Sequence, residues 1–219
     1  MIKALLFDFD NTLVKTREAI RIAEDKAFSY WSGRAGIPKA KLEQEWKRVV
    51  KEVSRSRNPR KRFREYSYPL LGKRLGIGHA GQVHAIFRQQ IKASLKPYPG
   101  ALALLNSLRQ YRLAIFTETP RTYTIAHARK TRILEKFDFV ITSTETGVMK
   151  PSNRYYRLAL RRLKLRPADC IVVGDDPIRD IEPANKLGFR TIVFRSKSRH
   201  ADYRVGSLSQ IPAIVKSLS

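Results

Sequence analysis

The chain has 219 residues, of which 42% are hydrophobic, and its 44 Lys and Arg residues outnumber 19 Asp and Glu residues. The hydrophobic fraction suffices for a packed core and argues against wholesale disorder. No run approaches the roughly 20 consecutive apolar residues that a membrane-spanning helix needs. The short N-terminal apolar stretch ends in two acids, with no small-residue cleavage site after it, so we expect no signal peptide. The single cysteine, Cys170, excludes an internal disulfide and favours the cytoplasm.

The formal net charge is +25. A field of this size attracts polyanions such as nucleic acid, and it also attracts small anionic substrates. A solvated basic surface without any ligand gives the same composition. Charge alone therefore leaves these interpretations open.

The first predicted element is a buried strand, "KALLFDF" (3–9). Residues 14–95 are helical in pattern and contain no convincing strand, and a segment dense in Arg and Lys lies at 55–64. "KPYPG" (96–100) is rich in Pro and Gly and marks the end of this helical region. The helical segments are "AIRIAEDKAFSYW", "KLEQEWKRVVKEV" and "HAIFRQQIKASL".

From residue 96 onward, strand and helix patterns alternate. Apolar strands in alternation with helices predict a parallel sheet that is covered on both faces. We therefore expect a doubly wound, Rossmann-like α/β core formed by residues 1–13 and 96–219, with an α-helical domain, 14–95, inserted after the first strand. The predicted strands are 112–117, 139–143, 170–175 and 191–194, and the predicted helices are 122–137, 153–165 and 180–188.

Polar residues follow several of these strands. In doubly wound sheets, ligands bind at the carboxyl ends of the strands. Each residue alone is typical of a turn or a helix cap, but their joint occurrence predicts a site. The residues are Asp8, Asp10, Thr117, Lys150, Asp175, Asp176 and Asp180.

Together these residues suit phosphoryl chemistry. Asp8, Asp10 and Asp175 would form a hard oxygen site for Mg²⁺, which relieves the repulsion between neighbouring carboxylates. An ionised Asp can attack phosphorus and give an aspartyl-phosphate. Thr117 can donate to phosphoryl oxygens, and Lys150 adds a positive charge. A second carboxyl group two residues after the nucleophile can protonate the leaving oxygen and then deprotonate water.

The order of these motifs resembles that of the haloacid dehalogenase-like superfamily of phosphohydrolases. "DFDNT" is similar to its first motif, "IFTET" to its second, "KPS" to its third and "VVGDDPIRDIEPANKLGFRTIVF" to its fourth. The resemblance covers the whole predicted sheet domain. It implies a phosphatase with a helical cap inserted after motif one.

Residue by residue, the resemblance implies that Asp8 is the nucleophile and Asp10 the general acid and base. It implies Mg²⁺ ligation by Asp8, the Asp10 main-chain carbonyl and Asp175. Thr117 and Lys150 would hold the phosphoryl group. Asp180 and Asp176 would orient Lys150 or metal-bound water.

Two residues refine the expected chemistry. Dehalogenating members of the family lack an acid at the position of Asp10, so Asp10 favours phosphoryl transfer. The residue after the motif-two Thr is often Asn in the family, whereas this chain has Glu118. We expect Glu118 either to point away from the phosphate or to contact a substrate hydroxyl or amine.

The leading hypothesis is a Mg²⁺-dependent phosphatase acting on a small anionic phosphate monoester. A phosphomutase would use the same chemistry. A nucleic-acid-binding protein, or a phosphatase of nucleic-acid ends, is the alternative that the basic charge raises. The segment Arg55 to Arg64 either lines the mouth of the site or forms a solvated outer face.

Overall fold

The computed structural model describes residues 1–56 and 63–218, and the chain divides into two compact units. One unit consists of Met1–Thr16 with Lys96–Ser219, and the other is Arg17–Leu95. Residues 57–62, within the basic segment at 55–64, lie outside the described residues. Among the described residues, no helix combines the length and the apolar character required to cross a membrane.

The first unit contains a six-stranded sheet in the order β3-β2-β1-β4-β5-β6, and every neighbouring pair is parallel. This arrangement confirms the predicted doubly wound, Rossmann-like sheet. β1 lies between β2 and β4, so the end of β1 is central in the fold. The strands are β1 (Ala4–Phe7), β2 (Arg112–Thr117), β3 (Phe139–Thr142), β4 (Cys170–Gly174), β5 (Arg190–Phe194) and β6 (Tyr203–Val205).

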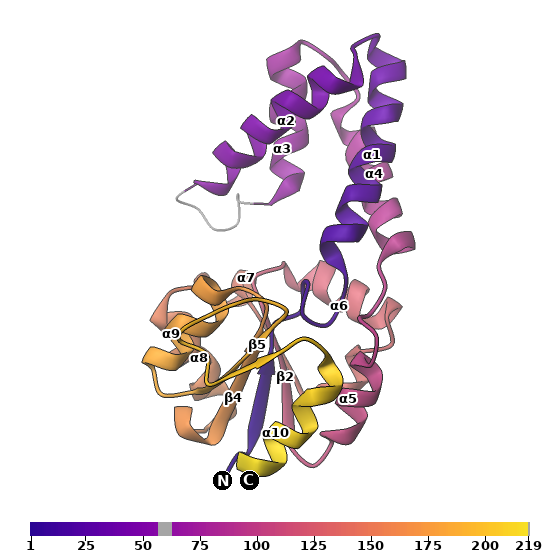
Figure 1. Ribbon diagram of the computed structural model, residues 1–219. Coiled ribbons are helices and arrows are strands. Elements are labelled where there is room, and N and C mark those ends of the chain that lie inside the picture. Colours follow the sequence, from indigo (N-terminus) through magenta and orange to yellow (C-terminus); the bar gives the residue numbers. More distant parts are fainter. Residues whose placement is uncertain (57–62, 219) are drawn as a thin grey trace. The chain divides into compact units, whose positions relative to one another are not determined.

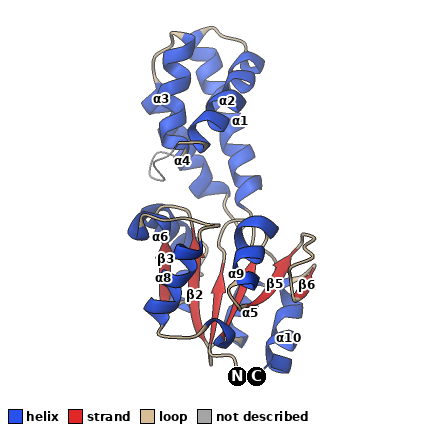
Figure 2. Ribbon diagram, turned by 90° about the vertical axis from the view of Figure 1, so that its left-hand side faces the viewer, coloured by secondary structure: helices blue, strands red, loops and turns tan. Residues whose placement is uncertain are grey.

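Helices cover both faces of this sheet, with α8 and α9 on one face and α5 and α10 on the other (Figures 1 and 2). Both faces are apolar because the central strands are buried along their length; all four residues of β1 are buried. The helices of this unit are α5 (Ala101–Ser107), α6 (Arg121–Lys130), α7 (Ser143–Thr146), α8 (Asn153–Leu163), the π-helical turn η4 (Pro177–Ile181), α9 (Glu182–Lys186) and α10 (Ile211–Leu218).

One predicted helix is shorter in the structure than the sequence pattern indicates. The pattern predicts helix over 122–137, but α6 ends at Lys130. Arg132 adopts a left-handed backbone, φ 58°, and the Ile133 N–H donates to the Ala128 carbonyl. This geometry satisfies the last turn of the helix. Because the left-handed residue is Arg rather than Gly, the sequence carries no stop signal there.

The second unit is helical. Its aromatic side chains pack together: Trp46 and Tyr68 have ring centroids 4.6 Å apart, and the Trp31 indole N–H donates to the Gly78 carbonyl. Trp31, Trp46 and Tyr68 therefore lie in the core of this unit, whereas Tyr66 is exposed. The helices are α1 (Thr16–Ala35), α2 (Lys39–Ser54), α3 (Arg64–Leu75) and α4 (Ala80–Ser94).

The two connections to the helical unit run beside each other. Val14 forms an antiparallel bridge with Pro97, and the Lys15 N–H donates to the Lys96 carbonyl at 2.9 Å. The Tyr98 N–H donates to the Leu13 carbonyl at 2.8 Å. The chain therefore leaves the sheet domain and returns to it at one place, just after β1.

We expect Leu6→Ala to lower the free energy of unfolding by about 2 to 5 kcal/mol, because it opens a cavity at the centre of the sheet. Leu6 is fully buried and lies between Ala114 of β2 and Val172 of β4. Denaturant unfolding measures the loss. Leu165→Ala is the control, since Leu165 is only partly buried against the same core. Equal losses in the two variants would contradict the central role of Leu6.

Candidate active site

The site residues lie where three adjacent strands end. Asp8 follows β1, Thr117 is the last residue of β2, and Asp175 follows β4. Since β1 lies between β2 and β4, the parallel register brings these three positions to one edge of the sheet. The Asp8 N–H donates to the Val173 carbonyl at 2.8 Å, which ties the start of the Asp8 loop to β4.

Asp8 and Asp10 have different environments although only one residue separates them. Phe9 between them is fully buried in the core. Asp8 is 8% exposed, and its Oδ2 accepts a hydrogen bond from the Thr12 hydroxyl at 3.2 Å. Asp10 is half-buried, and its carboxylate faces a different set of hydroxyl groups. The chain has turned after Asp8, so the pair does not lie on one strand face.

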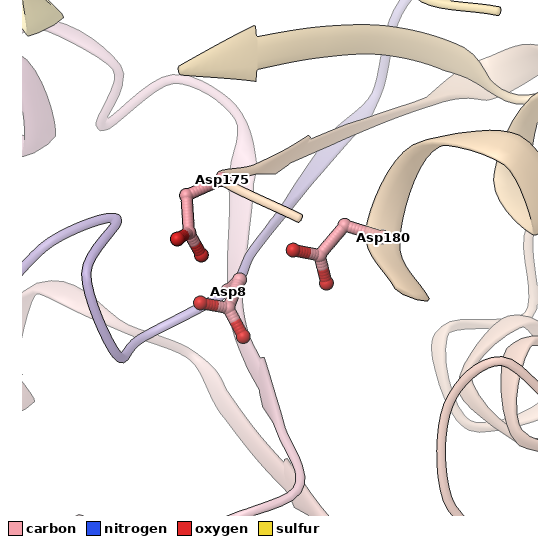
Figure 3. Close-up of side chains that lie close together, drawn as sticks. All are labelled: Asp8, Asp175 and Asp180. Atoms are coloured by element: carbon pink, nitrogen blue, oxygen red, sulfur yellow. The ribbon is translucent and has the colours of Figure 1, made fainter. Parts of the chain in front are cut away.

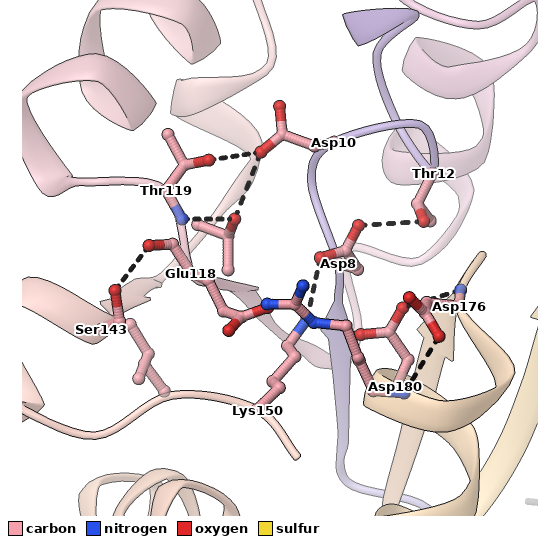
Figure 4. Close-up of polar contacts among 12 residues, drawn as sticks. Asp8, Asp10, Thr12, Glu118, Thr119, Ser143, Lys150, Asp176 and Asp180 are labelled. Atoms are coloured by element: carbon pink, nitrogen blue, oxygen red, sulfur yellow. Dashed lines mark hydrogen bonds and ion pairs between the residues drawn. The ribbon is translucent and has the colours of Figure 1, made fainter. Parts of the chain in front are cut away.

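Threonine hydroxyls surround the Asp10 carboxylate (Figure 4). Thr16 donates to Oδ1 at 2.6 Å, and Thr119 donates to Oδ2 at 2.6 Å. The Thr117 hydroxyl lies 3.5 Å from Oδ2 and accepts from the Thr119 N–H. Thr16 and Thr119 are not among the predicted site residues. Their only signal is that each lies within six residues of a predicted site residue, and threonine is common in loops.

Lys150 is buried between two carboxylates. Its ammonium lies 2.8 Å from Asp8 Oδ1 and 2.6 Å from Asp180 Oδ1, and its side chain is 2% exposed. Burial alone would lower the pKa of Lys150, but Asp180 and Asp8 outweigh it and raise this pKa well above its usual range. Lys150 is therefore a permanent cation in direct contact with Asp8.

Asp180 is held close to the backbone of β4. Its Oδ2 accepts the Asp176 N–H at 3.1 Å, and the Asp176 carboxylate caps η4 by accepting from the N–H groups of Ile178 and Arg179. A Cβ at Gly174 would lie 2.3 Å from Asp180 Oδ2. Position 174 therefore has room only for glycine. Asp176 caps the turn that carries Asp180, whereas Asp180 contacts Lys150 itself.

The carboxylates of Asp8, Asp175 and Asp180 can bring one oxygen each within 4.8 Å of one another (Figure 3). Three carboxylate oxygens are the hard donors that Mg²⁺ prefers, so these residues fit the cation. The predicted set of metal ligands is Asp8, Asp10 and Asp175. In the structure, the carboxylate of Asp180 lies near Asp8 and Asp175, whereas the Asp10 carboxylate accepts hydrogen bonds from threonine hydroxyls. Asp180 already accepts from Lys150 and from the Asp176 N–H. Asp8 likewise accepts from Lys150 and from the Thr12 hydroxyl, so the Lys150 ammonium offsets part of the negative charge of this group.

Asp8 also requires positive charge around it. Burial raises the pKa of the Asp8 carboxyl well above its usual range, and the charges of Asp180 and Asp10 add to the rise, while Lys150 opposes it. A divalent cation beside Asp8 would act in the same direction as Lys150, because it favours the ionised form.

We expect Gly174→Ala to displace Asp180 and to lower the free energy of unfolding by about 1 to 3 kcal/mol, because the new methyl group overlaps the Asp180 side chain. A crystal structure and denaturant unfolding of the variant measure both effects. Gly206→Ala is the matched control, since a Cβ there meets no atom within 4 Å. An undisturbed Asp180–Lys150 contact in Gly174→Ala would contradict the prediction.

Comparison with known proteins finds phosphatases among the relatives of this chain. The chain is 29% identical over 235 residues to a glyceraldehyde 3-phosphate phosphatase from Methanocaldococcus jannaschii, which covers 100% of this chain and 99% of the relative. It is 31% identical over 133 residues to a ribulose-1,5-bisphosphate 5-phosphatase from Halopiger xanaduensis, across 53% of this chain and 56% of the relative.

Solved structures with the same fold include a phosphatase and a dehalogenase. The phosphatase, from Thermococcus onnurineus, has a TM-score of 0.76 at 22% identity and covers 98% of both chains. The L-2-haloacid dehalogenase from Xanthobacter autotrophicus has a TM-score of 0.76 at 21% identity and covers 100% of both chains. At this identity the likeness shows the fold only. The sequence model of one protein family, the haloacid dehalogenase-like hydrolases, matches residues 2–188. The chain therefore belongs to this family of enzymes.

Proposed function

We propose that this protein is a Mg²⁺-dependent phosphatase that hydrolyses a small phosphate monoester through an aspartyl-phosphate on Asp8. The observation that carries the proposal is a second carboxylate, Asp10, that is separated from Asp8 and bound by the hydroxyls of Thr16 and Thr119. A site with one buried nucleophile and one independently held acid suits transfer of a phosphoryl group to water.

Asp8 is the nucleophile in this proposal. Its buried carboxylate contacts the Lys150 ammonium and the Thr12 hydroxyl, which fix its orientation. In-line attack on phosphorus transfers the phosphoryl group to an Asp8 oxygen and releases the alcohol. Lys150 and Thr117 then lie beside the phosphoryl oxygens, where a fixed cation and a hydroxyl donor stabilise the negative charge.

Asp10 moves the proton. Its protonated carboxyl gives a proton to the leaving alkoxide oxygen, and the resulting carboxylate then takes a proton from the water that attacks the acyl phosphate. The neighbouring threonine hydroxyls hold this carboxylate on the side away from Lys150. Asp8 and Asp10 can thus have different protonation states although they are close in sequence.

Mg²⁺ fits beside Asp8 and Asp175, with the Asp10 main-chain carbonyl as a further proposed ligand. When bound, the cation supplies charge neutralisation between the anionic nucleophile and the anionic phosphate. Asp180 holds Lys150 in place, and Asp176 caps the turn that carries Asp180.

The relatives support a small substrate, because full-length relatives are named glyceraldehyde 3-phosphate phosphatases. Such a substrate is a three-carbon phosphate monoester. We assign the helical unit Arg17–Leu95, inserted after the Asp8 loop, as a cap that completes substrate recognition.

Three alternatives have less support. Dehalogenating members of the family lack an acid at the position of Asp10, whereas this chain has one there. A phosphomutase would use the same residues and replace water with a sugar hydroxyl. A role with nucleic acid rests on the net charge of +25 and on the basic segment at 55–64, of which residues 57–62 lie outside the described residues.

We expect Asp8→Asn to abolish phosphate release from glyceraldehyde 3-phosphate, because the amide is not a nucleophile. We expect Asp10→Asn to lower kcat by about 100- to 10,000-fold, the usual value of general acid–base catalysis. Steady-state kinetics measures both effects, and circular dichroism checks the fold. The control is Asp25→Asn, on an exposed side chain of α1. Wild-type turnover by Asp8→Asn would refute the mechanism.

Removal of the metal provides an independent test. We expect EDTA to abolish activity and added Mg²⁺ to restore it, because the clustered carboxylates need a cation. Asp175→Asn should raise the Mg²⁺ concentration for half-maximal activity by more than about tenfold, since a ligand is lost. Asp25→Asn again serves as the control. Full activity in EDTA would rule out the metal-dependent form of the proposal.

A further inference from the structure

An ion pair joins the loops on either side of the Asp8 strand. Glu118 directly follows Thr117 at the end of β2, and Arg179 directly precedes Asp180 in η4, after β4. The Arg179 guanidinium contacts Glu118 Oε2. Because β1 lies between β2 and β4, this pair spans the end of the strand that leads to Asp8. The pair therefore lies beside the proposed phosphoryl site.

The main chain on each side of the pair is fixed. The Glu118 carbonyl accepts a hydrogen bond from the Ser143 hydroxyl at 2.5 Å. The Arg179 N–H donates to Asp176, and its carbonyl accepts from the Tyr156 hydroxyl. Both side chains therefore project from anchored positions beside the site, as Figure 4 shows for Glu118 relative to Lys150 and Asp8.

The charge of Glu118 is only partly neutralised. The side chain is 16% exposed, whereas that of Arg179 is 45% exposed. Glu118 Oε2 has Arg179 as its partner, but Oε1 is buried without a hydrogen-bond donor among the residues that the structure describes. Burial raises the pKa of Glu118, while Lys150 and Arg179 oppose the rise, so this carboxyl senses the cation of the phosphoryl site.

A partly compensated buried carboxylate repels other anions over a distance of several ångströms. In the proposed mechanism, Lys150 is the cation for the phosphoryl group. A second anionic group beside the pair would meet the Glu118 carboxylate and the Arg179 guanidinium, and this guanidinium is already paired with Glu118. Specificity arises from such a repulsive element as well as from attractive contacts.

We propose that Glu118, tuned by Arg179, is a specificity-determining residue that selects phosphate monoesters with an uncharged organic part and disfavours those with a second anionic group. This inference rests on the proposed phosphatase function and adds the class of substrate. The family often has an uncharged Asn at this position, which would leave the phosphate site less negative. The inference gives the negative charge of Glu118 a role.

The test uses two substrates with the same carbon skeleton, glyceraldehyde 3-phosphate and 3-phosphoglycerate, which carry an uncharged aldehyde and a negatively charged carboxylate at the same carbon. The readout is the ratio of their kcat/KM values. We expect the wild-type ratio to favour the aldehyde. Glu118→Gln should lower this ratio about tenfold, because it removes the repelling charge and retains the shape of the side chain.

Arg179→Gln should change the same ratio in the opposite direction, because it leaves the Glu118 charge without its partner. Glu182→Gln is the matched control, since Glu182 pairs with Lys186 on α9, and its ratio should equal that of the wild type. Thermal unfolding checks that each variant is folded, and Glu118→Asn replaces Glu118→Gln if the latter is not.

Opposite shifts in the Glu118 and Arg179 variants support the inference. An unchanged ratio, shifts in the same direction, or an equal loss on both substrates would overturn it while leaving the phosphatase proposal intact. If the wild-type protein releases phosphate from neither substrate nor from other small phosphate monoesters, the proposed function itself fails and the inference fails with it.

Discussion

The buried contact of Lys150 with Asp8 and Asp180 is the interaction on which the rest of the site depends. Removing an ammonium group from water costs several kcal/mol, and only well-placed opposite charges compensate for it. Here two carboxylates from different strand ends lie within 2.8 Å of the ammonium. Asp180 can approach because Gly174 has no side chain, and Asp176 caps the turn that supports it. The residues that follow β4 thus hold Asp180 where it can pair with Lys150.

Charge acts on two length scales in this molecule. The net charge of +25 produces a long-range field that draws anions of any kind toward the surface. Within the site, each cation has a defined anionic partner: Lys150 faces Asp8 and Asp180, and Arg179 faces Glu118. Long-range attraction concentrates anionic molecules, and we propose that the local pairs select among them. A strongly basic protein can therefore be selective against highly charged substrates.

Much of the sheet was predictable from the sequence, because its central strands are continuous apolar runs that end in polar residues. The end of β2 agrees with the prediction, whereas β1 ends two residues before and β4 one residue before the predicted end. Short elements were harder to predict. β6 has only three residues, and α3 begins in the basic segment and contains Pro69. The premature end of α6 depends on the left-handed backbone of Arg132, which the residue type does not signal.

The detailed contacts of the site could not be predicted, for a different reason. Thr119 contacts Asp10 across 109 residues of sequence, and only the folded register of β1 and β2 brings them together. The pairing of Glu118 with Arg179 likewise depends on the strand order. Sequence motifs predicted which residues carry the chemistry, whereas the residues that hold them in place became visible only in three dimensions.

The wide separation of the Lys150 partners along the chain has a consequence for the order of protein synthesis. Asp8 emerges first, Lys150 follows 142 residues later, and Asp180 follows after another 30. Until Asp180 is available, the sheet cannot bury Lys150 with both counter-charges. A nascent or truncated chain that ends before Asp180 therefore retains an incompletely neutralised cation in its interior. The second counter-charge of Lys150 thus becomes available only late in synthesis, once η4 has been made.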